Sequence, residues 1–360
     1  MKILNEQKPW WKASSNELAY IKNLKNTVND GHITFSKNCI KIENYLKKIL
    51  KVRYVILANS GTSALFMATL AANLENKKKV FCPVMTWSGT INGSLYSQKK
   101  IEFIDNKKGD VNAEYKSFIN KIGKNDILFL THLNGKSAYD KQLYKILKKK
   151  NFFVIEDAAQ AFLAKDFNNK YLGTQFDIGC FSLSYTKMCN MVYGGFCVTN
   201  NLKLAKLLKT IRNNGVDNDK QIANSVGGNF KPNDLNASIG IESLNSAFRN
   251  KKKLVEIYKT YKKYLKNKKI NILKYNNLKK EFPIYIEVVV ENRNKFINFL
   301  KKKKIGYSYS TRSLSRSKHI YSKRLFKNAD KIDKMLLRLP SGPGYNKKDI
   351  IKIVNQLNEF

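Results

Sequence analysis

The first candidate for chemistry in this sequence is the segment Asn59-Ser60-Gly61-Thr62-Ser63, which lies between a short apolar run and an apolar helical stretch. Backbone N–H groups and hydroxyls gathered at the start of a helix can bind a phosphate. A Ser/Thr helix cap with a permissive glycine would look the same, and the segment has neither the lysine of a Walker loop nor GxGxxG spacing. By itself, the segment is compatible with both interpretations.

The second candidate is the pair Glu156-Asp157, which follows the apolar residues Phe152 to Ile155. Open α/β sheets place ligands at the carboxyl ends of their strands, and a strand that ends here would deliver both carboxylates to that edge. Asp157 could pair with the protonated ring nitrogen of a cofactor, or it could cap a helix that starts at Ala158.

The third candidate is Lys187, which follows the apolar run Gly179 to Ser182 and a turn rich in Ser and Thr. Arg supplies eight of the 67 basic residues and Lys the other 59, so the residue type alone carries no information. Partial desolvation behind a buried strand would favour a neutral, nucleophilic amine, although a surface lysine after a strand is the simpler alternative. Together the three segments offer a phosphate anchor, a partner for a pyridine nitrogen and an amine that traps a carbonyl, which are the parts that pyridoxal 5'-phosphate (PLP) requires.

The elements that would position these residues alternate between short apolar runs and longer polar or amphipathic segments from Tyr54 to Asn200. This alternation predicts an α/β domain with a mostly parallel sheet flanked by helices. Predicted helices include Thr62 to Asn73 and Ala138 to Lys149. The predicted strands are Tyr54 to Ala58, Val80 to Cys82, Ile101 to Ile104, Ile127 to Leu130, Phe152 to Glu156, Ile178 to Ser182 and Gly195 to Thr199.

After residue 245 the chain continues with a long Lys-rich helical stretch, an apolar run from Phe282 to Val290, and helices at Arg293 to Lys304 and near Asp349 to Phe360. This order predicts a smaller C-terminal α/β domain. We therefore divide the chain into residues 1–245, an N-terminal segment with a large cofactor-binding domain, and residues 246–360. No Pro/Gly linker marks the boundary.

The formal charge of +40 is compatible with nucleic acid, an anionic surface or an acidic substrate. Lysine recurs along nearly the whole chain, however, and phosphate and base recognition favours the arginine fork. We therefore attribute the charge to solvated faces and expect no nucleic-acid partner, while the field would still attract a small anionic substrate. The odd number of cysteines, the absence of a CxxC pair and the wide separation of His32, His132 and His319 argue against a metal site.

No apolar run reaches the ~18 to 20 residues of a membrane span, and Met1 to Trp11 lacks a long apolar core. We expect a cytoplasmic protein that does not enter a membrane.

An ordered series of motifs resembles the DegT/DnrJ/StrS family of sugar aminotransferases, which are fold-type I PLP enzymes. The agreement is extensive up to residue 250 and thinner afterwards. The motifs are Ser60 to Leu65, Pro83 to Trp87, Thr131 to Gly135, Glu156 to Ala161, Asp177 to Ser182, Thr186-Lys187, Gly194-Gly195, Ile211 to Gly215, Gly227 to Phe230 and Leu339-Pro340.

The resemblance implies a role for each matching residue. Lys187 would form the Schiff base with PLP and move the proton during transfer, and Asp157 would keep the ring nitrogen protonated. Gln160 would bond the ring hydroxyl, and Trp87 would stack on the ring, where the family usually has a smaller aromatic side chain. The cofactor phosphate would be held by Gly61, Thr62, Ser63 and Ser182, and by Asn229 of a neighbouring subunit, which implies a homodimer with shared active sites.

Some positions depart from the family pattern. Asn214 stands where the family commonly has His, and Phe230-Lys231 stands where it has Tyr-Arg, so the substrate contacts are in doubt. The segment Ser310 to Arg324 is unusually basic. Its Arg312, Arg316 or Lys318 could meet a substrate phosphate, although a solvated basic loop explains them too.

The resemblance implies an aminotransferase that moves an amino group, from glutamate, to a keto carbon of a nucleotide-linked deoxysugar for surface-glycan assembly. The cofactor would alternate between PLP and pyridoxamine 5'-phosphate. One alternative is a PLP-dependent sugar dehydratase of the same family, in which the lysine position is typically histidine. Another is a catalytically silent regulatory or nucleic-acid-binding protein on this scaffold, which the charge would favour.

Overall fold

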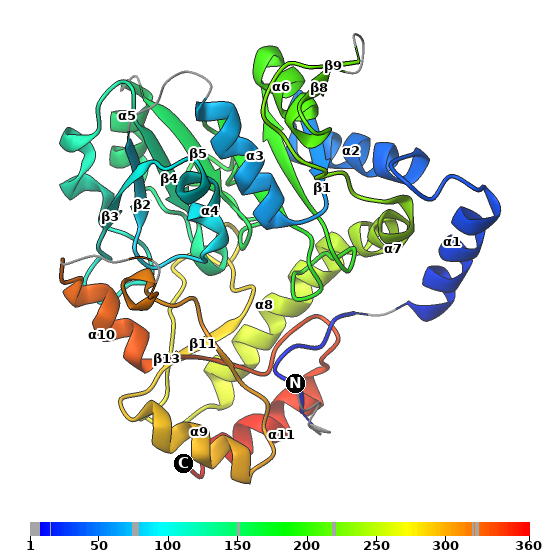
Figure 1. The fold of residues 1–360 in the computed structure, drawn as a ribbon. Helices are drawn as coiled ribbons and strands as arrows, with labels where there is room; N and C mark the ends of the chain where they lie inside the picture. The colour runs from blue at the N-terminus through cyan, green and yellow to red at the C-terminus, as the bar shows by residue number, and fades with distance from the viewer. Residues whose placement is uncertain are drawn as a thin grey trace.

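The computed structural model describes residues 8–14, 16–73, 79–149, 152–217, 221–318, 320 and 324–360. Its centre is a seven-stranded sheet with the order β1-β7-β6-β5-β4-β2-β3 (Figure 1). All neighbouring strands are parallel except β7, which is antiparallel to both β1 and β6. The strands are β1 (Tyr54–Ala58), β2 (Lys79–Pro83), β3 (Lys100–Ile104), β4 (Ile127–Thr131), β5 (Phe153–Asp157), β6 (Ile178–Ser182) and β7 (Gly195–Thr199). The predicted mostly parallel α/β sheet is confirmed, and each predicted strand end lies within one residue of the observed end.

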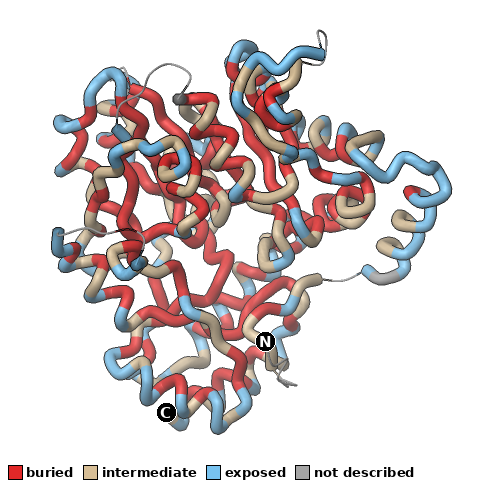
Figure 2. The backbone as a smooth tube through the Cα atoms, in the orientation of Figure 1, coloured by how far each residue is buried: buried red, intermediate tan, exposed pale blue. Residues whose placement is uncertain are grey.

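The strands are apolar along their whole length because both faces of the sheet are covered. In β4, Leu128 and Leu130 pack into one core cluster, whereas Ile127 and Phe129 pack into another on the opposite face. Successive side chains of a strand point to opposite faces, so one short run serves two cores. Figure 2 shows this central region as continuously buried backbone.

Helices cover both faces. On one face lie α3 (Gly61–Asn73), α4 (Gly89–Tyr96) and α6 (Leu202–Arg212), and on the other lie α2 (Lys37–Leu50), α5 (Lys141–Lys149), α7 (Asp234–Asn245) and the first part of α8 (Ala247–Tyr264). The helix predicted from Ala138 begins three residues later, because Asp140 caps it by accepting a hydrogen bond from the Leu143 N–H at 2.8 Å. α1 (Glu17–Asn29) contacts α7 and projects from the body of the molecule (Figure 1).

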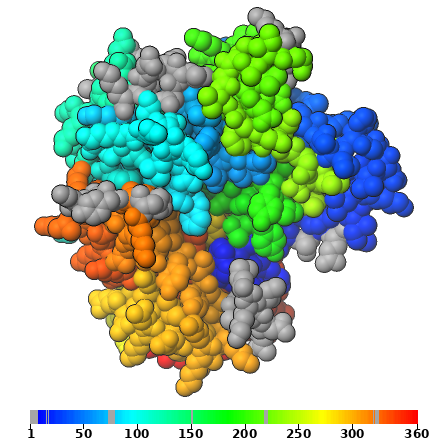
Figure 3. All heavy atoms as spheres, viewed as in Figure 1, coloured from blue at the N-terminus to red at the C-terminus, as the bar shows by residue number. Residues whose placement is uncertain are grey.

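A four-stranded antiparallel sheet with the order β10-β11-β13-β12 forms the C-terminal part. Its strands are β10 (Asn271–Ile272), β11 (Ile286–Val289), β12 (Ser308–Tyr309) and β13 (Leu336–Leu339), and its helices are α9 (Arg293–Lys302), α10 (Lys327–Met335) and α11 (Lys347–Leu357). Figure 3 shows these segments, yellow to red, gathered on one side of the large sheet domain. The remaining short elements are β8 (Val216–Asp217), β9 (Ile222–Ala223) and the 3-10 helices η1 (Tyr115–Ser117), η2 (Ile119–Lys121), η3 (Leu133–Gly135) and η4 (Leu314–Arg316).

α8 belongs to both parts of the molecule. Its Ala247 and Leu254 pack in the core of the large sheet, whereas Ile257 and Tyr261 pack in the core of the small one. The division at residues 245 and 246 stays a prediction, because the helix that follows it runs without a break through both cores. The N-terminal residues 8–12 lie against the C-terminal part, where Trp11 pairs with Ser341.

Within the described ranges, no helix is long and apolar enough to cross a membrane. The same residues contain no group of three or more His, Cys, Asp or Glu side chains placed to hold a metal ion. His319 lies outside the described residues.

Candidate active site

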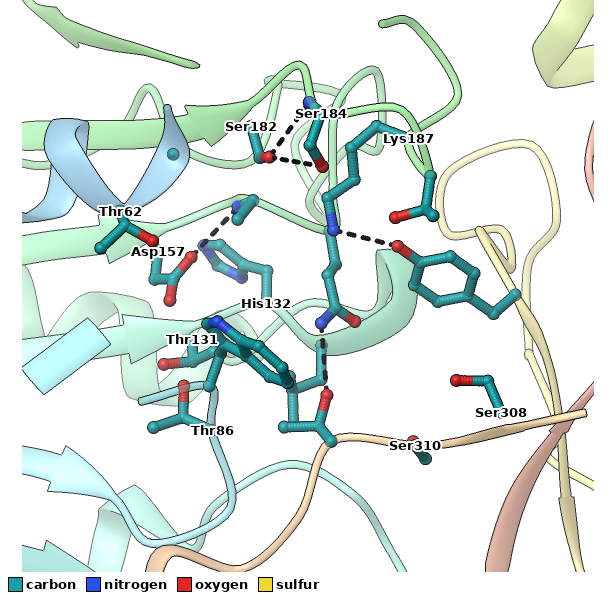
Figure 4. Close-up of a pocket in the computed structure, with 18 of the residues that line it drawn as sticks. Thr62, Thr86, Thr131, His132, Asp157, Ser182, Ser184, Lys187, Ser308 and Ser310 are labelled. Carbon is teal, nitrogen blue, oxygen red and sulfur yellow. Dashed lines mark hydrogen bonds between the residues drawn. The ribbon is translucent and has the colours of Figure 1, made fainter. Parts of the chain in front are cut away.

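The carboxyl ends of β1, β4, β5 and β6 open into a cavity of about 660 Å³, which the C-terminal part closes from the other side (Figure 4). Seven of the nine predicted site residues line this cavity, and Ser63 and Asn229 are not among its lining residues. The seven come from segments spread over more than 120 residues of sequence. They are Gly61, Thr62, Trp87, Asp157, Gln160, Ser182 and Lys187.

One end of the cavity is the start of α3. Ser60 caps this helix by accepting a hydrogen bond from the Ser63 N–H at 3.0 Å. A Cβ on Gly61 would lie 2.8 Å from the Ser182 Cβ, and a Cβ on Gly195 would lie 2.4 Å from the Ser60 carbonyl carbon. Only glycines let the backbone of the loop lie this close to β6 and β7. The unpaired N–H groups of the first helical turn and the hydroxyls of Thr62 and Ser182 form a cradle suited to a phosphate.

Ser63 is not among the residues that line the cavity, and its contact with the cofactor phosphate stays a prediction. Its hydroxyl donates to the Asn59 Oδ1 at 2.6 Å and lies 2.8 Å from the Ser60 Oγ. Its side chain therefore braces the loop. Asn229 is exposed beside the same loop, where its carbonyl accepts from the Asn59 Nδ2 at 3.2 Å.

Asp157 ends β5 with a nearly buried carboxylate that is 4% exposed. Its Oδ2 accepts from the Thr90 hydroxyl at 2.7 Å, and its Oδ1 accepts from the Ala159 N–H at 3.1 Å. Burial raises the pKa of Asp157, and the bond from Thr90 is the largest effect that opposes it. A cationic group placed against this carboxylate would offset the cost of burying it, so the site fits a protonated ring nitrogen.

The neighbouring Glu156 serves the protein interior. Its carboxylate accepts from the backbone N–H groups of Gly173, Gln175 and Phe176 and lies 3.2 Å from the Nε2 of His132. The Ala138 N–H donates to the Nδ1 of that imidazole at 3.0 Å, so the ring proton sits on Nε2 and faces Glu156. Of the two carboxylates at this strand end, only Asp157 lines the cavity.

Lys187 reaches across the cavity to the C-terminal part. Its Nζ donates to the Tyr285 hydroxyl at 2.9 Å, and the Arg338 guanidinium carbon lies 4.0 Å from the centroid of the Tyr285 ring. Although burial raises the pKa of Tyr285, the charges of Lys187 and Arg338 bring it below its ordinary value. The lysine amine is therefore held in the cavity by an acidic phenol rather than left in solvent.

Gln160 and Trp87 complete the predicted set. The Gln160 Oε1 accepts from the Asn134 N–H at 3.1 Å, and its Nε2 donates to the Thr311 hydroxyl at 3.2 Å. The Trp87 indole is 64% exposed and lines the cavity, so its apolar face is available to a ring bound there.

Tyr285, Arg338 and the buried Glu287 were not predicted from the sequence. The Glu287 Oε1 accepts a hydrogen bond from the Arg338 Nε at 3.1 Å. The sequence did contain a signal for Glu287: it is a charged residue inside an apolar run, and a buried carboxylate must be paired. Tyr285 had none, since 98 residues separate it from Lys187.

The sequence matches the DegT/DnrJ/EryC1/StrS aminotransferase family over residues 15–358. The chain belongs to this family. It is 28% identical to the GDP-perosamine synthase of Escherichia coli O157:H7, with 89% of both chains covered. It is also 28% identical to the UDP-4-amino-4,6-dideoxy-N-acetyl-beta-L-altrosamine transaminase of Campylobacter jejuni, with 91% and 90% covered.

A solved structure of this family has the same fold. Helicobacter pylori PseC, an aminotransferase involved in the biosynthesis of pseudoaminic acid, aligns with a TM-score of 0.87, covering 98% of both chains at 21% identity. The predicted fold-type I architecture and the predicted family are confirmed, and the protein is an aminotransferase of a PLP-dependent family.

Proposed function

We propose that this aminotransferase holds PLP on Lys187 and transfers an amino group from an amino acid, glutamate, to a keto carbon of a nucleotide-linked deoxysugar. The observation that supports it most is the meeting of Lys187, Asp157 and the Gly61 cradle in one cavity. The names of the two sequence relatives, a GDP-sugar and a UDP-sugar enzyme, support the class of acceptor. We expect the product to enter surface-glycan assembly.

Different cavity residues would bind different parts of the cofactor. Gly61, Thr62 and Ser182 would bind its phosphate, Asp157 its ring nitrogen and Gln160 its ring hydroxyl. PLP, when bound, supplies an electron sink for the bond that breaks at the substrate carbon. Because Asp157 is only 4% exposed, its interaction with a positive charge is strengthened by the low local dielectric constant.

Lys187 has two tasks in this proposal. Its amine would hold the cofactor covalently, and the Tyr285 hydroxyl, 2.9 Å from Nζ, would keep the side chain in the cavity whenever the amine is free. The free amine would then act as the base and acid that removes and returns the proton at the substrate carbon. The lowered pKa of Tyr285 suits a phenol that exchanges a proton with this lysine.

A second copy of the chain would complete the site. Asn229 is exposed beside the cradle loop, and large apolar side chains of α1, including Leu18 (83% exposed) and Ile21 (64% exposed), lack a cover within the described part of one chain. We propose a homodimer in which Asn229 binds the cofactor phosphate of the partner. Light scattering should give twice the chain mass, and a monomer that still binds PLP tightly would exclude this arrangement.

All five cysteines lie buried and unpaired, which suits a reducing compartment, and we place the enzyme in the cytoplasm.

The function is tested by loading purified protein with pyridoxamine 5'-phosphate and offering it keto-sugar nucleotides one at a time. We expect one of them to gain an amine, detected by mass, while the visible absorbance of lysine-linked PLP returns. A deoxygenated, amine-free sugar would instead identify the dehydratase. Steeply salt-dependent DNA binding with no cofactor spectrum would identify the silent binding protein.

A further inference from the structure

Three arginines of the C-terminal part gather around Asp333, beside the cavity. Arg312 lines the cavity, and its Nε lies 2.6 Å from the Asp333 Oδ1. Arg316 lies 3.1 Å from the Asp333 Oδ2, and Arg293 donates to the Asp333 carbonyl. We name Arg293, Arg312 and Arg316 the arginine cluster. Because the Asp333 side chain is 1% exposed, the carboxylate that orients two of the three guanidinium groups is itself fixed in the interior.

The cluster carries more positive charge than its buried partner can neutralise. The guanidinium groups of Arg312 and Arg316 share the one Asp333 carboxylate, whereas Arg293 bonds only the Asp333 backbone carbonyl. The nearby Asp330 accepts a hydrogen bond from the Ser315 hydroxyl at 2.8 Å. Burial lowers the pKa of Arg293, and the charge of Arg312 lowers it further. The side chains of Arg312 and Arg316 remain 39% and 40% exposed, so both can still reach a ligand. An anion would relieve the repulsion among the three.

The place of the cluster separates it from the cofactor phosphate. Figure 4 shows Thr62, of the cradle, at one side of the cavity and the strand that carries Ser308 and Ser310 at the other, with Lys187 between them. Arg312 follows Ser310 by two residues and lines the same side of the cavity. The cavity thus has one anion site at the start of α3 and a second concentration of positive charge across from it.

An aromatic side chain accompanies the arginines. The Tyr309 ring lies 5.2 Å from the guanidinium carbons of both Arg293 and Arg312 and is 46% exposed. An exposed aromatic face beside guanidinium groups can stack on a nucleobase or cover a sugar. The hydroxyls of Ser308 and Thr311 line the same wall.

We propose that Arg312 and Arg316, oriented by Asp333 beside Arg293, form the subsite that binds the diphosphate of the nucleotide part of the substrate. This inference rests on the proposed nucleotide-sugar acceptor. The planar fork of arginine matches two phosphate oxygens at once, and a diphosphate offers oxygens to two forks. The keto sugar, attached to the diphosphate, then extends from this wall toward Lys187.

The subsite is tested by calorimetry on the protein loaded with PLP, so that the cradle is occupied, with UDP, GDP and inorganic pyrophosphate as probes. We expect at least one nucleoside diphosphate to bind, and Arg312→Gln to weaken that binding about 10- to 100-fold, as expected for a lost charged hydrogen bond. Arg312→Lys keeps the charge beside Asp333 but loses the fork, and should weaken binding by a smaller factor. Uridine and guanosine, which lack phosphate, should show no difference between the variants.

The control is Arg53→Gln, because Arg53 is exposed at the amino end of β1, opposite the edge where the cavity opens. Equal weakening by Arg53→Gln would show a diffuse field and overturn the subsite, and so would unchanged binding in Arg312→Gln. A retained PLP spectrum and melting temperature confirm that each variant is folded. If wild-type protein reacts with glutamate but binds no nucleoside diphosphate, the subsite fails while the aminotransferase stands, whereas no reaction with any amino donor counts against the proposed function itself.

Discussion

Gly195→Ala should loosen the phosphate cradle by displacing the backbone of Ser60 and Gly61. Gly195 is the first residue of β7 and pairs with Ala58 on one side and Ser182 on the other. A Cβ there would lie 2.4 Å from the carbonyl carbon and oxygen of Ser60 and 2.5 Å from the Gly61 nitrogen. These are backbone atoms that cannot rotate away, so the loop must move outward from the sheet.

We expect Gly195→Ala to lower both the stability of the protein and its affinity for PLP. Inserting a methyl group into a packed site costs roughly 1–3 kcal/mol of unfolding free energy, which corresponds to a fall of about 1–4 °C in melting temperature for a chain of this size. Displacing the start of α3 should also remove one charge-assisted bond from an N–H group to the phosphate, worth about 1.5–3 kcal/mol. At about 1.4 kcal/mol per tenfold change, the Kd for PLP should rise about 10- to 150-fold.

The assay is a titration of cofactor-free protein with PLP, followed by visible absorbance, beside thermal unfolding. Gly123→Ala is the matched control, because a Cβ at this exposed glycine would meet a single side chain, Asp126, with its Oδ2 at 3.3 Å. A Kd for PLP within twofold of wild type in folded Gly195→Ala protein would refute the argument that this loop grips the phosphate.

Two further substitutions test the link between the sheet and the C-terminal part. Asn134→Ala removes the side-chain oxygen that accepts from the Ile284 N–H at 2.9 Å and the Tyr285 N–H at 2.8 Å, so two buried donors lose their partner. We expect a loss of about 2–5 kcal/mol in urea unfolding, and a loss below about 1 kcal/mol would contradict this clamp. Tyr285→Phe removes a phenol whose pKa is lowered in the folded protein. The ionised phenol therefore stabilises the fold fully above its unfolded pKa of 10.0, and this contribution is lost as pH falls through the lower pKa of the folded protein. The unfolding free energy of wild type minus that of Tyr285→Phe should therefore grow from pH 7 to pH 10; a flat difference would show an unperturbed phenol.

The strands were predictable because each is a short apolar run buried on both faces, as in β4, and the ends of parallel strands meet at one edge. That rule placed Asp157 at the ligand-binding edge of the sheet, and the resemblance to the family added Gly61 and Ser182 to the same site. Lys187 needed the other two motifs, because its residue type occurs throughout the chain.

The far wall of the cavity was not predictable from local pattern. Tyr285 and Arg338 reach the site because the C-terminal part docks on the sheet, and the clamp that fixes this docking is Asn134, a residue with a left-handed backbone (φ 48°) 151 positions from Tyr285. The periodicity of neighbouring residues cannot predict a contact between residues 151 positions apart. The basic segment from Ser310 was visible, but only the buried Asp333 shows that Arg312 and Arg316 are held in place.

Reductive trapping shows which lysine carries the cofactor. Purified protein saturated with PLP would be treated with borohydride, digested and analysed by mass spectrometry, with Lys187→Ala as the control. We expect a pyridoxyl adduct on Lys187 alone among the 59 lysines, and none in the variant. An adduct on another lysine, or an equal yield in Lys187→Ala, would contradict it.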